Sequence, residues 1–157
     1  MKVIFIAMAL VYSGLAMADV AVGDRVIYLS LNMAKDNSEQ IISRTRWAKE
    51  ILAVASDDNQ ALVQLENNHG EFSQAWVPLD QLGYIDDIEV FCKNLRPQGE
   101  AANLEELVIR AGRFKTCKVQ SGDGSETSWY AGDVPFGLVK RFVITDDYYQ
   151  IDELSRH

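Results

Sequence analysis

The sequence predicts a mainly β protein: an antiparallel meander that forms a curved sheet, a half-barrel or a barrel, with at most one or two short helices. Apolar and polar residues alternate with a period of two along most of the chain, which is the pattern of half-buried strands. Short clusters of Asn, Asp and Gly separate these runs, and such clusters form the tight turns of hairpins. A strand spacing of about 8–12 residues is typical of small all-β domains.

The first eighteen residues predict a secretory signal peptide. Lys2 is the only charge before Asp19, and a wholly apolar run at 3–12 is followed by the small-residue site Ala16-Met17-Ala18. A basic start, a short apolar core and such a site make up a signal peptide. The run is also shorter than the roughly 20 residues that span a bilayer. We expect cleavage between Ala18 and Asp19 and a periplasmic or secreted protein; a buried N-terminal helix is the alternative.

The rest of the chain predicts one acidic β domain at 19–157. Removing 18 of 157 residues leaves 139, and losing Lys2 takes the formal net charge from −8 to −9. That length suits a single domain, and we expect no transmembrane segment in it. Such an acidic chain has no basic footprint for a phosphate backbone, which argues against a nucleic-acid partner.

Strand-like runs in the first half lie at 25–31, 40–48, 51–56, 61–66 and 71–77. On the first run, alternation places Ile27, Leu29 and Leu31 on the face opposite Val26 and Tyr28. The last three runs are separated by short polar turns, which is a hairpin signal.

The second half begins with an irregular segment at 78–95, in which 80–83 predicts one short helical turn closed by Gly83. A loop follows at 96–99. Further strands are predicted at 104–110, 112–120, 126–131 and 137–144, with turns at Gly112 and at Pro135–Gly137. The acidic segment 146–154 closes the chain.

Cys92 and Cys117 predict a disulfide bond, because an even number of cysteines in an exported chain favours pairing. Two separate buried thiols are the alternative. We expect no metal site, since a structural zinc ion needs four ligands and the only histidines are His69 and His157.

Catalytic patterns are sparse. The sequence holds no Gly-x-Ser-x-Gly elbow, Walker loop or dinucleotide fingerprint, and we expect no cofactor. Adjacent acids such as Asp57-Asp58 point to opposite faces of a strand or lie in turns, so they do not converge on one substrate atom. We therefore expect a protein that is not an enzyme.

Aromatic and aliphatic residues of the C-terminal strands are the candidate binding site. Period-two counting places Phe114, Trp129, Leu138 and Phe142 on one side of the sheet. We expect them to border an apolar concavity that binds a ligand; an ordinary sealed core is the alternative.

The most distinctive pattern combines Ala111-Gly112-Arg113-Phe114-Lys115-Thr116-Cys117 with Val134-Pro135-Phe136-Gly137-Leu138-Val139-Lys140. This AGxFxTC…VPFGLVK combination resembles a group of exported bacterial proteins of unknown function. More distantly, it resembles the half-barrels of periplasmic lipoprotein carriers. The resemblance covers roughly residues 90–145 and implies a curved antiparallel sheet, with no catalytic residue to transfer.

Three functions follow as hypotheses. The first is an exported, non-enzymatic binding or carrier-like protein for an apolar small molecule, a lipidic ligand or a lipidated protein. The second is an envelope scaffold or interaction protein without a small-molecule ligand. The third is a hydrolase with carboxylate chemistry, which would need two inward carboxylates in one cleft.

Overall fold

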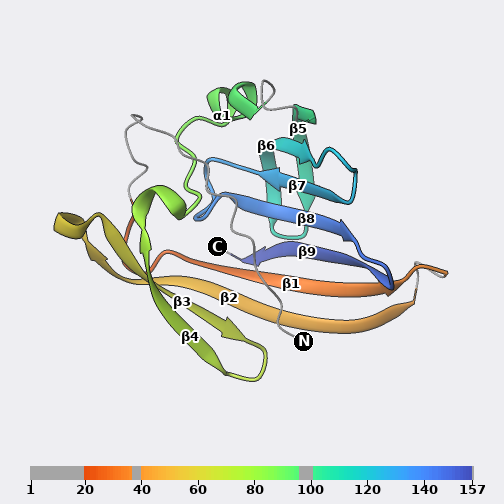
Figure 1. Ribbon diagram of the computed structural model, residues 1–157, viewed down its shortest axis with the longest axis horizontal. Coiled ribbons are helices and arrows are strands. Elements are labelled where there is room, and N and C mark those ends of the chain that lie inside the picture. Colours follow the sequence, from red (N-terminus) through yellow and green to blue (C-terminus); the bar gives the residue numbers. More distant parts are fainter. Residues whose placement is uncertain (1–19, 37–39, 96–100, 157) are drawn as a thin grey trace.

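A computed structural model describes residues 20–36, 40–95 and 101–156 (Figure 1). The predicted signal peptide at 1–18, its cleavage site and the loop predicted at 96–99 lie outside the described residues. Within them, nine antiparallel strands form one curved, unclosed sheet, accompanied by a single short α-helix. The predicted fold class is confirmed.

The strands are β1 (Arg25–Ala34), β2 (Ile41–Ala55), β3 (Gln60–Asn67), β4 (Phe72–Pro78), β5 (Ala101–Ile109), β6 (Gly112–Gln120), β7 (Glu126–Tyr130), β8 (Leu138–Ile144) and β9 (Tyr148–Arg156). The helix α1 spans Ile88–Leu95, and two 3₁₀ turns, η1 and η2, span Ser56–Asp58 and Leu79–Gln81. Across the sheet the order is β4-β3-β2-β1-β9-β8-β7-β6-β5. Two meanders are thus joined where the first strand pairs with the last.

Three elements differ from the sequence prediction. The runs at 40–48 and 51–56 form one strand, β2, because a register shift between Ile51 and Ala53 absorbs the break in alternation. The closing segment, for which no strand was predicted, forms β9. The irregular segment at 78–95 contains α1, while the short helical turn predicted at 80–83 corresponds to η2.

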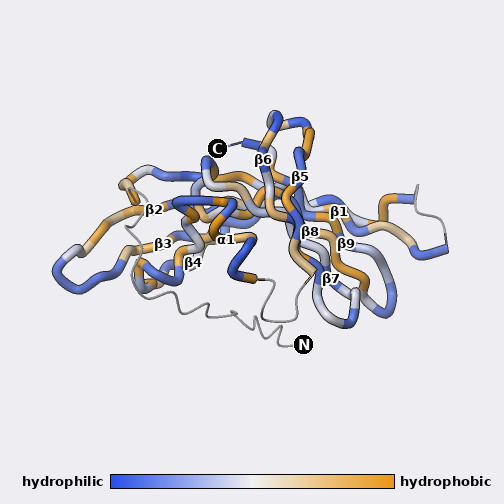
Figure 2. Tube along the Cα trace, turned by 90° about the horizontal axis from the view of Figure 1, so that it is seen from above, coloured by the Kyte–Doolittle hydropathy of each residue, from blue (hydrophilic) through white to orange (hydrophobic). Residues whose placement is uncertain are grey.

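The two faces of the sheet carry different sets of side chains. We call the face that carries Tyr28 and Leu154, which lie opposite each other on β1 and β9, the inner face. The outer face carries Leu31, Ile151 and Phe142, which are register partners on β1, β9 and β8. Seen from above, the β2–β4 and β7–β9 parts of the sheet extend to opposite sides of α1 (Figure 2).

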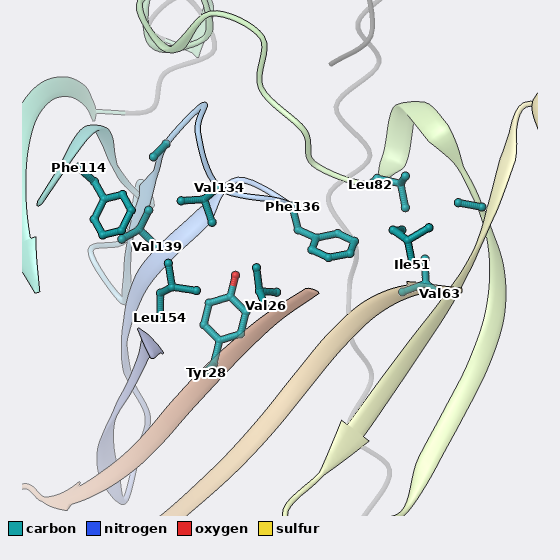
Figure 3. Packing of buried hydrophobic residues seen from close by; sticks show 12 residues of the cluster. Val26, Tyr28, Ile51, Val63, Leu82, Phe114, Val134, Phe136, Val139 and Leu154 are labelled. Atoms are coloured by element: carbon teal, nitrogen blue, oxygen red, sulfur yellow. The ribbon is translucent and has the colours of Figure 1, made fainter. Parts of the chain in front are cut away.

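The main hydrophobic core lies on the inner face. Val26, Tyr28 and Leu154 of the strands pack there with Leu82 and Phe136 from the connecting segments (Figure 3). The Tyr28 hydroxyl donates a hydrogen bond to the Leu138 carbonyl oxygen at 2.6 Å. That bond satisfies the one polar atom which the buried ring brings into the core.

Two glycines let the segments over the core approach each other. A Cβ atom at Gly137 would lie 2.5 Å from the Gly83 carbonyl oxygen, and both glycines have positive φ, +72° and +84°. A larger residue at Gly137 would therefore clash with backbone as well as adopt an unfavourable conformation.

The helix α1 is fastened to β6. The Asp87 carboxylate accepts hydrogen bonds from the backbone N–H groups of Glu89 and Val90, which caps the first turn.

The predicted cysteine pair is at disulfide distance, with the Cα atoms of Cys92 and Cys117 5.5 Å apart. Both cysteines are buried in a second apolar cluster under the helix.

Candidate functional site

The outer face carries a stripe of apolar side chains across three central strands. In one row Phe142 of β8 lies opposite Ile151 of β9, which lies opposite Leu31 of β1. In the next row Ile144, Tyr149 and Met33 are aligned in the same way. We call these six residues the apolar stripe. The rings of Phe142 and Tyr149 stack across the two rows with centroids 5.7 Å apart.

The apolar stripe is partly exposed to solvent. Five of its six residues are half-buried, and Ile144 is 41 % exposed. Ile41 of β2, which lies opposite Met33, extends the stripe and is also exposed. Single exposed apolar side chains are ordinary, but a contiguous apolar patch on a soluble domain marks a binding surface.

Cationic side chains flank the stripe on β2. Arg44 lies opposite Leu31, and Arg46 lies opposite Leu29 on the same face. Both arginines are exposed, and among the described residues neither has a carboxylate within ion-pair distance. Two such arginines give this part of the outer face a local positive charge in a chain whose net charge is −8.

A small polar hollow lies next to Arg46. It has a volume of about 180 Å³ and is lined by Arg25, Arg46, Ala48, Glu66, Asn67, Asn68 and Gly70. Arg25 pairs there with Glu66 at 3.1 Å and with Glu50 at 3.5 Å, whereas Arg46 has no such partner in the described part of the chain. Whole small-molecule pockets have volumes of about 300–1,000 Å³, so this hollow is smaller than a ligand-sized pocket.

The four residues predicted to bind a ligand occupy two different environments. Phe114 is 3 % exposed and belongs to the main core, and Leu138 packs against that core. Trp129 and Phe142 lie on the outer face, where Trp129 is opposite Lys140 and Phe142 is opposite Thr127. A ligand-binding role for all four stays a prediction.

Strand irregularities explain this division. Phe114 lies on the part of β6 that pairs only with β5, since β7 pairs with β6 only from Cys117 to Gln120. A register shift follows Trp129, so that Tyr130 lies opposite Leu138 while Trp129 lies opposite Lys140. Such an irregularity breaks strict alternation, and simple counting places Leu138 on the side of Phe142.

Trp129 is held in a polar setting beside the stripe. Its indole N–H donates to the Glu105 carboxylate at 2.6 Å. The ammonium groups of Lys118 and Lys140 lie 5.5 and 5.7 Å from the ring centroid, within the range of cation–π attraction. Trp129 is therefore a natural fluorescent reporter for anything that binds next to Phe142.

Most residues of the stripe were not singled out by the sequence prediction. The apolar outer face of β1 was visible as the alternating set that ends at Leu31. Its neighbours on β9 were not, because no strand was predicted there. Arg44 and Arg46 were visible only as polar members of the run at 40–48.

Other site types are not evident in residues 20–36, 40–95 and 101–156. That part of the chain contains no cluster of three or more His, Cys, Asp or Glu side chains able to hold a metal ion. Nor does it contain a helix with the length and apolar character needed to cross a bilayer.

No known protein-family model matches the chain. No curated protein matches it in sequence.

Proposed function

We propose that this protein is an exported, non-enzymatic binding protein that holds an acidic amphiphile, such as a fatty acid or an anionic lipid, on its outer face. The apolar chain of the ligand lies along the stripe, and its acidic group lies at Arg44 and Arg46. The observation that carries the proposal is the partly exposed row of apolar side chains beside two arginines that no carboxylate of the described residues neutralises.

Apolar burial supplies most of the binding energy. A chain that covers about 300 Å² of combined apolar surface gains about 7 kcal/mol at roughly 25 cal/mol per Å², before the costs of ordering the ligand. Solvent-exposed ion pairs contribute about 0–1 kcal/mol each. The stripe therefore determines affinity, and the arginines determine the preference for an acidic head group.

Export is supported by two separate features. The first eighteen residues have the parts of a signal peptide. A cysteine pair at disulfide distance suits an oxidising compartment outside the cytosol.

Binding of a fluorescent fatty-acid analogue tests the proposal. We expect saturable binding that quenches Trp129, and Trp129→Phe removes this part of the signal. Ile144→Asn removes an exposed apolar contact and weakens binding about tenfold. The control Val108→Asn changes an exposed aliphatic residue of β5, 63 % exposed against 41 % for Ile144, and leaves affinity within about twofold, the scatter expected for a residue that the ligand does not touch.

Charge reversal tests the position of the acidic group. Arg46→Glu weakens binding by up to about fivefold at low salt and by less at high salt, because an exposed pair is weak and screened. Arg110→Glu makes the same charge change in the turn after β5 and has no such effect. The proposal is overturned if no saturable binding is seen. It is also overturned if Val108→Asn weakens binding as much as Ile144→Asn does, and Arg110→Glu as much as Arg46→Glu does.

A second candidate function is an envelope interaction protein without a small-molecule ligand. The observation that favours it is the free edge strand β4, whose aromatic side chains are exposed.

A further inference from the structure

Strand β4 forms one free edge of the sheet. Its sequence, Phe-Ser-Gln-Ala-Trp-Val-Pro, contains no charged residue. Residues 72–76 are all exposed, with Phe72 66 % and Trp76 51 % exposed. Free edges usually carry charge, proline or cover that prevents pairing with another strand, and the first five residues of β4 have none of these.

The hydrogen-bond pattern of the β3–β4 hairpin identifies the free backbone groups. The Asn67 N–H donates to the Glu71 carbonyl oxygen at 3.0 Å, and the Leu79 N–H donates to the Asn59 carbonyl oxygen at 3.0 Å. Hydrogen-bonded pairs alternate in an antiparallel ladder. The residues that bond to β3 are therefore Ser73, Ala75 and Val77, and the N–H and C=O groups of Phe72, Gln74 and Trp76 point away from the sheet.

We propose that two copies of this chain pair through β4, antiparallel, about a two-fold axis at Gln74. In this register Phe72 lies opposite the partner subunit's Trp76, and Gln74 lies opposite the partner subunit's Gln74. The three outward residues of each strand then form about six backbone hydrogen bonds, two for each bonded pair. The four aromatic rings form two cross-strand pairs on the outer face, a favourable arrangement in antiparallel sheets.

This register pairs more of the outward-facing residues of β4 than either adjacent register does. A two-fold axis at Ser73 leaves Trp76 without an outward-facing partner. An axis at Ala75 places Phe72 opposite Pro78 of the second strand, and proline has no N–H to donate. Only the axis at Gln74 pairs all three outward residues.

Charge distinguishes β4 from the other free edge, β5. Strand β5 carries Glu105 and Glu106 at its centre, so antiparallel self-pairing about that point sets like charges against each other. On β4 no charge faces a charge. The only repulsion comes from the net charge of −8 on each chain, and salt screens it.

The area involved predicts a weak dimer. Four aromatic side chains that are half to two-thirds exposed contribute roughly 500 Å², given about 150–250 Å² for each buried ring. Stable interfaces bury about 1,200–2,000 Å² in total. We therefore expect a dissociation constant in the micromolar range or weaker, which decreases as salt is added.

Sedimentation velocity from about 5 to 500 µM tests this proposal, a range chosen to bracket a weak transient interface. The wild-type protein shows a concentration-dependent shift from monomer to dimer. Gln74→Lys and Gln74→Glu each place like charges opposite each other across the axis, and each weakens the dimer at least about tenfold. An equal mixture of the two variants restores it, because the lysine of one chain then faces the glutamate of the other across the same axis.

The matched control is Val108→Lys, which introduces the same charge at an exposed position on β5 and leaves the dimer intact. Circular dichroism of each variant confirms that the fold is kept. A wild-type protein that stays monomeric up to about 500 µM, the highest concentration in the series, overturns the proposal and leaves the edge for an extended segment of another protein. A dimer that survives both Gln74 variants, or that Val108→Lys abolishes, also overturns it.

Discussion

The guanidinium of Arg141 donates two hydrogen bonds to the same carboxylate oxygen of Asp152, at 3.0 Å from Nε and 2.7 Å from the terminal nitrogen. Asp152 is only 1 % exposed. Its other oxygen accepts a hydrogen bond from the Ser30 hydroxyl at 2.5 Å. This network links β8, β9 and β1, the strands at which the two meanders of the sheet are joined. It therefore fixes the one pairing in the sheet that joins the two ends of the chain.

Arg141→Met destabilises the protein by about 3–5 kcal/mol, because it leaves the buried Asp152 carboxylate without its cation. Urea unfolding measures this change. Replacing both partners, as in Arg141→Met with Asp152→Leu, costs less than the single change because no buried charge is left unpaired. A double variant that is less stable than Arg141→Met would show that the network does not carry this role.

Lys49 makes the free energy of unfolding depend on pH in the alkaline range. The residue lies opposite Val26 of the core, with its ammonium 4.1 Å from the Phe136 ring centroid, and burial lowers the pKa of Lys49 to about 8. Between pH values of about 8 and 10 the unfolded chain keeps a proton that the folded chain has lost, so the free energy of unfolding rises with pH. The rise is on the order of 2–3 kcal/mol. Thermal unfolding of Lys49→Met checks this, since the variant lacks the rise.

Two tyrosines reverse this trend above a pH of about 10, the ordinary pKa of the side chain. Burial raises the pKa of Tyr28. Burial and the hydrogen bond that the Tyr84 hydroxyl donates to Asp24 raise the pKa of Tyr84. The unfolded chain then loses protons that the folded chain retains, and stability falls as pH rises. We expect a stability maximum near a pH of about 10 in the wild type, and Tyr84→Phe makes the decline above it shallower. A wild-type profile that declines steadily from neutral pH to a pH of about 10 would contradict the Lys49 assignment, and one that goes on rising above that pH would contradict the tyrosine assignments.

Cys117→Ser lowers the free energy of unfolding by about 2–5 kcal/mol, the usual cost of losing a native disulfide. The loss concentrates at α1, which is fastened to the sheet through Cys92. Amide hydrogen exchange should therefore speed up in residues 88–95 more than in β1 and β2. Equal stability of the variant and the wild type under oxidising conditions would show that the bridge contributes nothing.

N-terminal sequencing of protein recovered from the periplasm checks the export prediction. The mature chain is expected to begin at Asp19, because Ala16 and Ala18 match the small-residue pattern that signal peptidases recognise. Recovery of a chain that still begins with Met1 would count against export through a cleaved signal.

Local patterns predicted the hairpins well and the long-range features poorly. Alternation and turn residues located β3, β4, β6, β7 and β8 to within a few residues, because neighbouring strands and a short turn determine them. The β1–β9 pairing was not visible, since it joins the two ends of the chain. The helix α1 was missed although Ile88, Phe91, Cys92 and Leu95 stand at helical spacing. With only eight residues, that period covers little more than two turns and lies inside a segment that otherwise looked irregular.

The site was predictable only in part for the same reason. Trp129 and Phe142 share the outer face as the alternation indicated. Phe114 and Leu138 depart from it where a strand ends and where the register shifts. Ile151 and Tyr149 lie in the stripe only because β9 forms and pairs with β1 and β8. Arg44 and Arg46 lie beside the stripe only because β2 pairs with β1.

Native mass spectrometry of the protein, purified from its own envelope under gentle conditions, measures directly whether the outer face binds an acidic lipid. We expect the wild type to carry an acidic lipid as a bound mass. We expect Ile144→Asn to carry much less, and Val108→Asn to carry as much as the wild type. A wild-type protein that is recovered without any bound lipid would contradict lipid binding on the outer face. So would an Ile144→Asn variant that carries as much of the same lipid as the wild type.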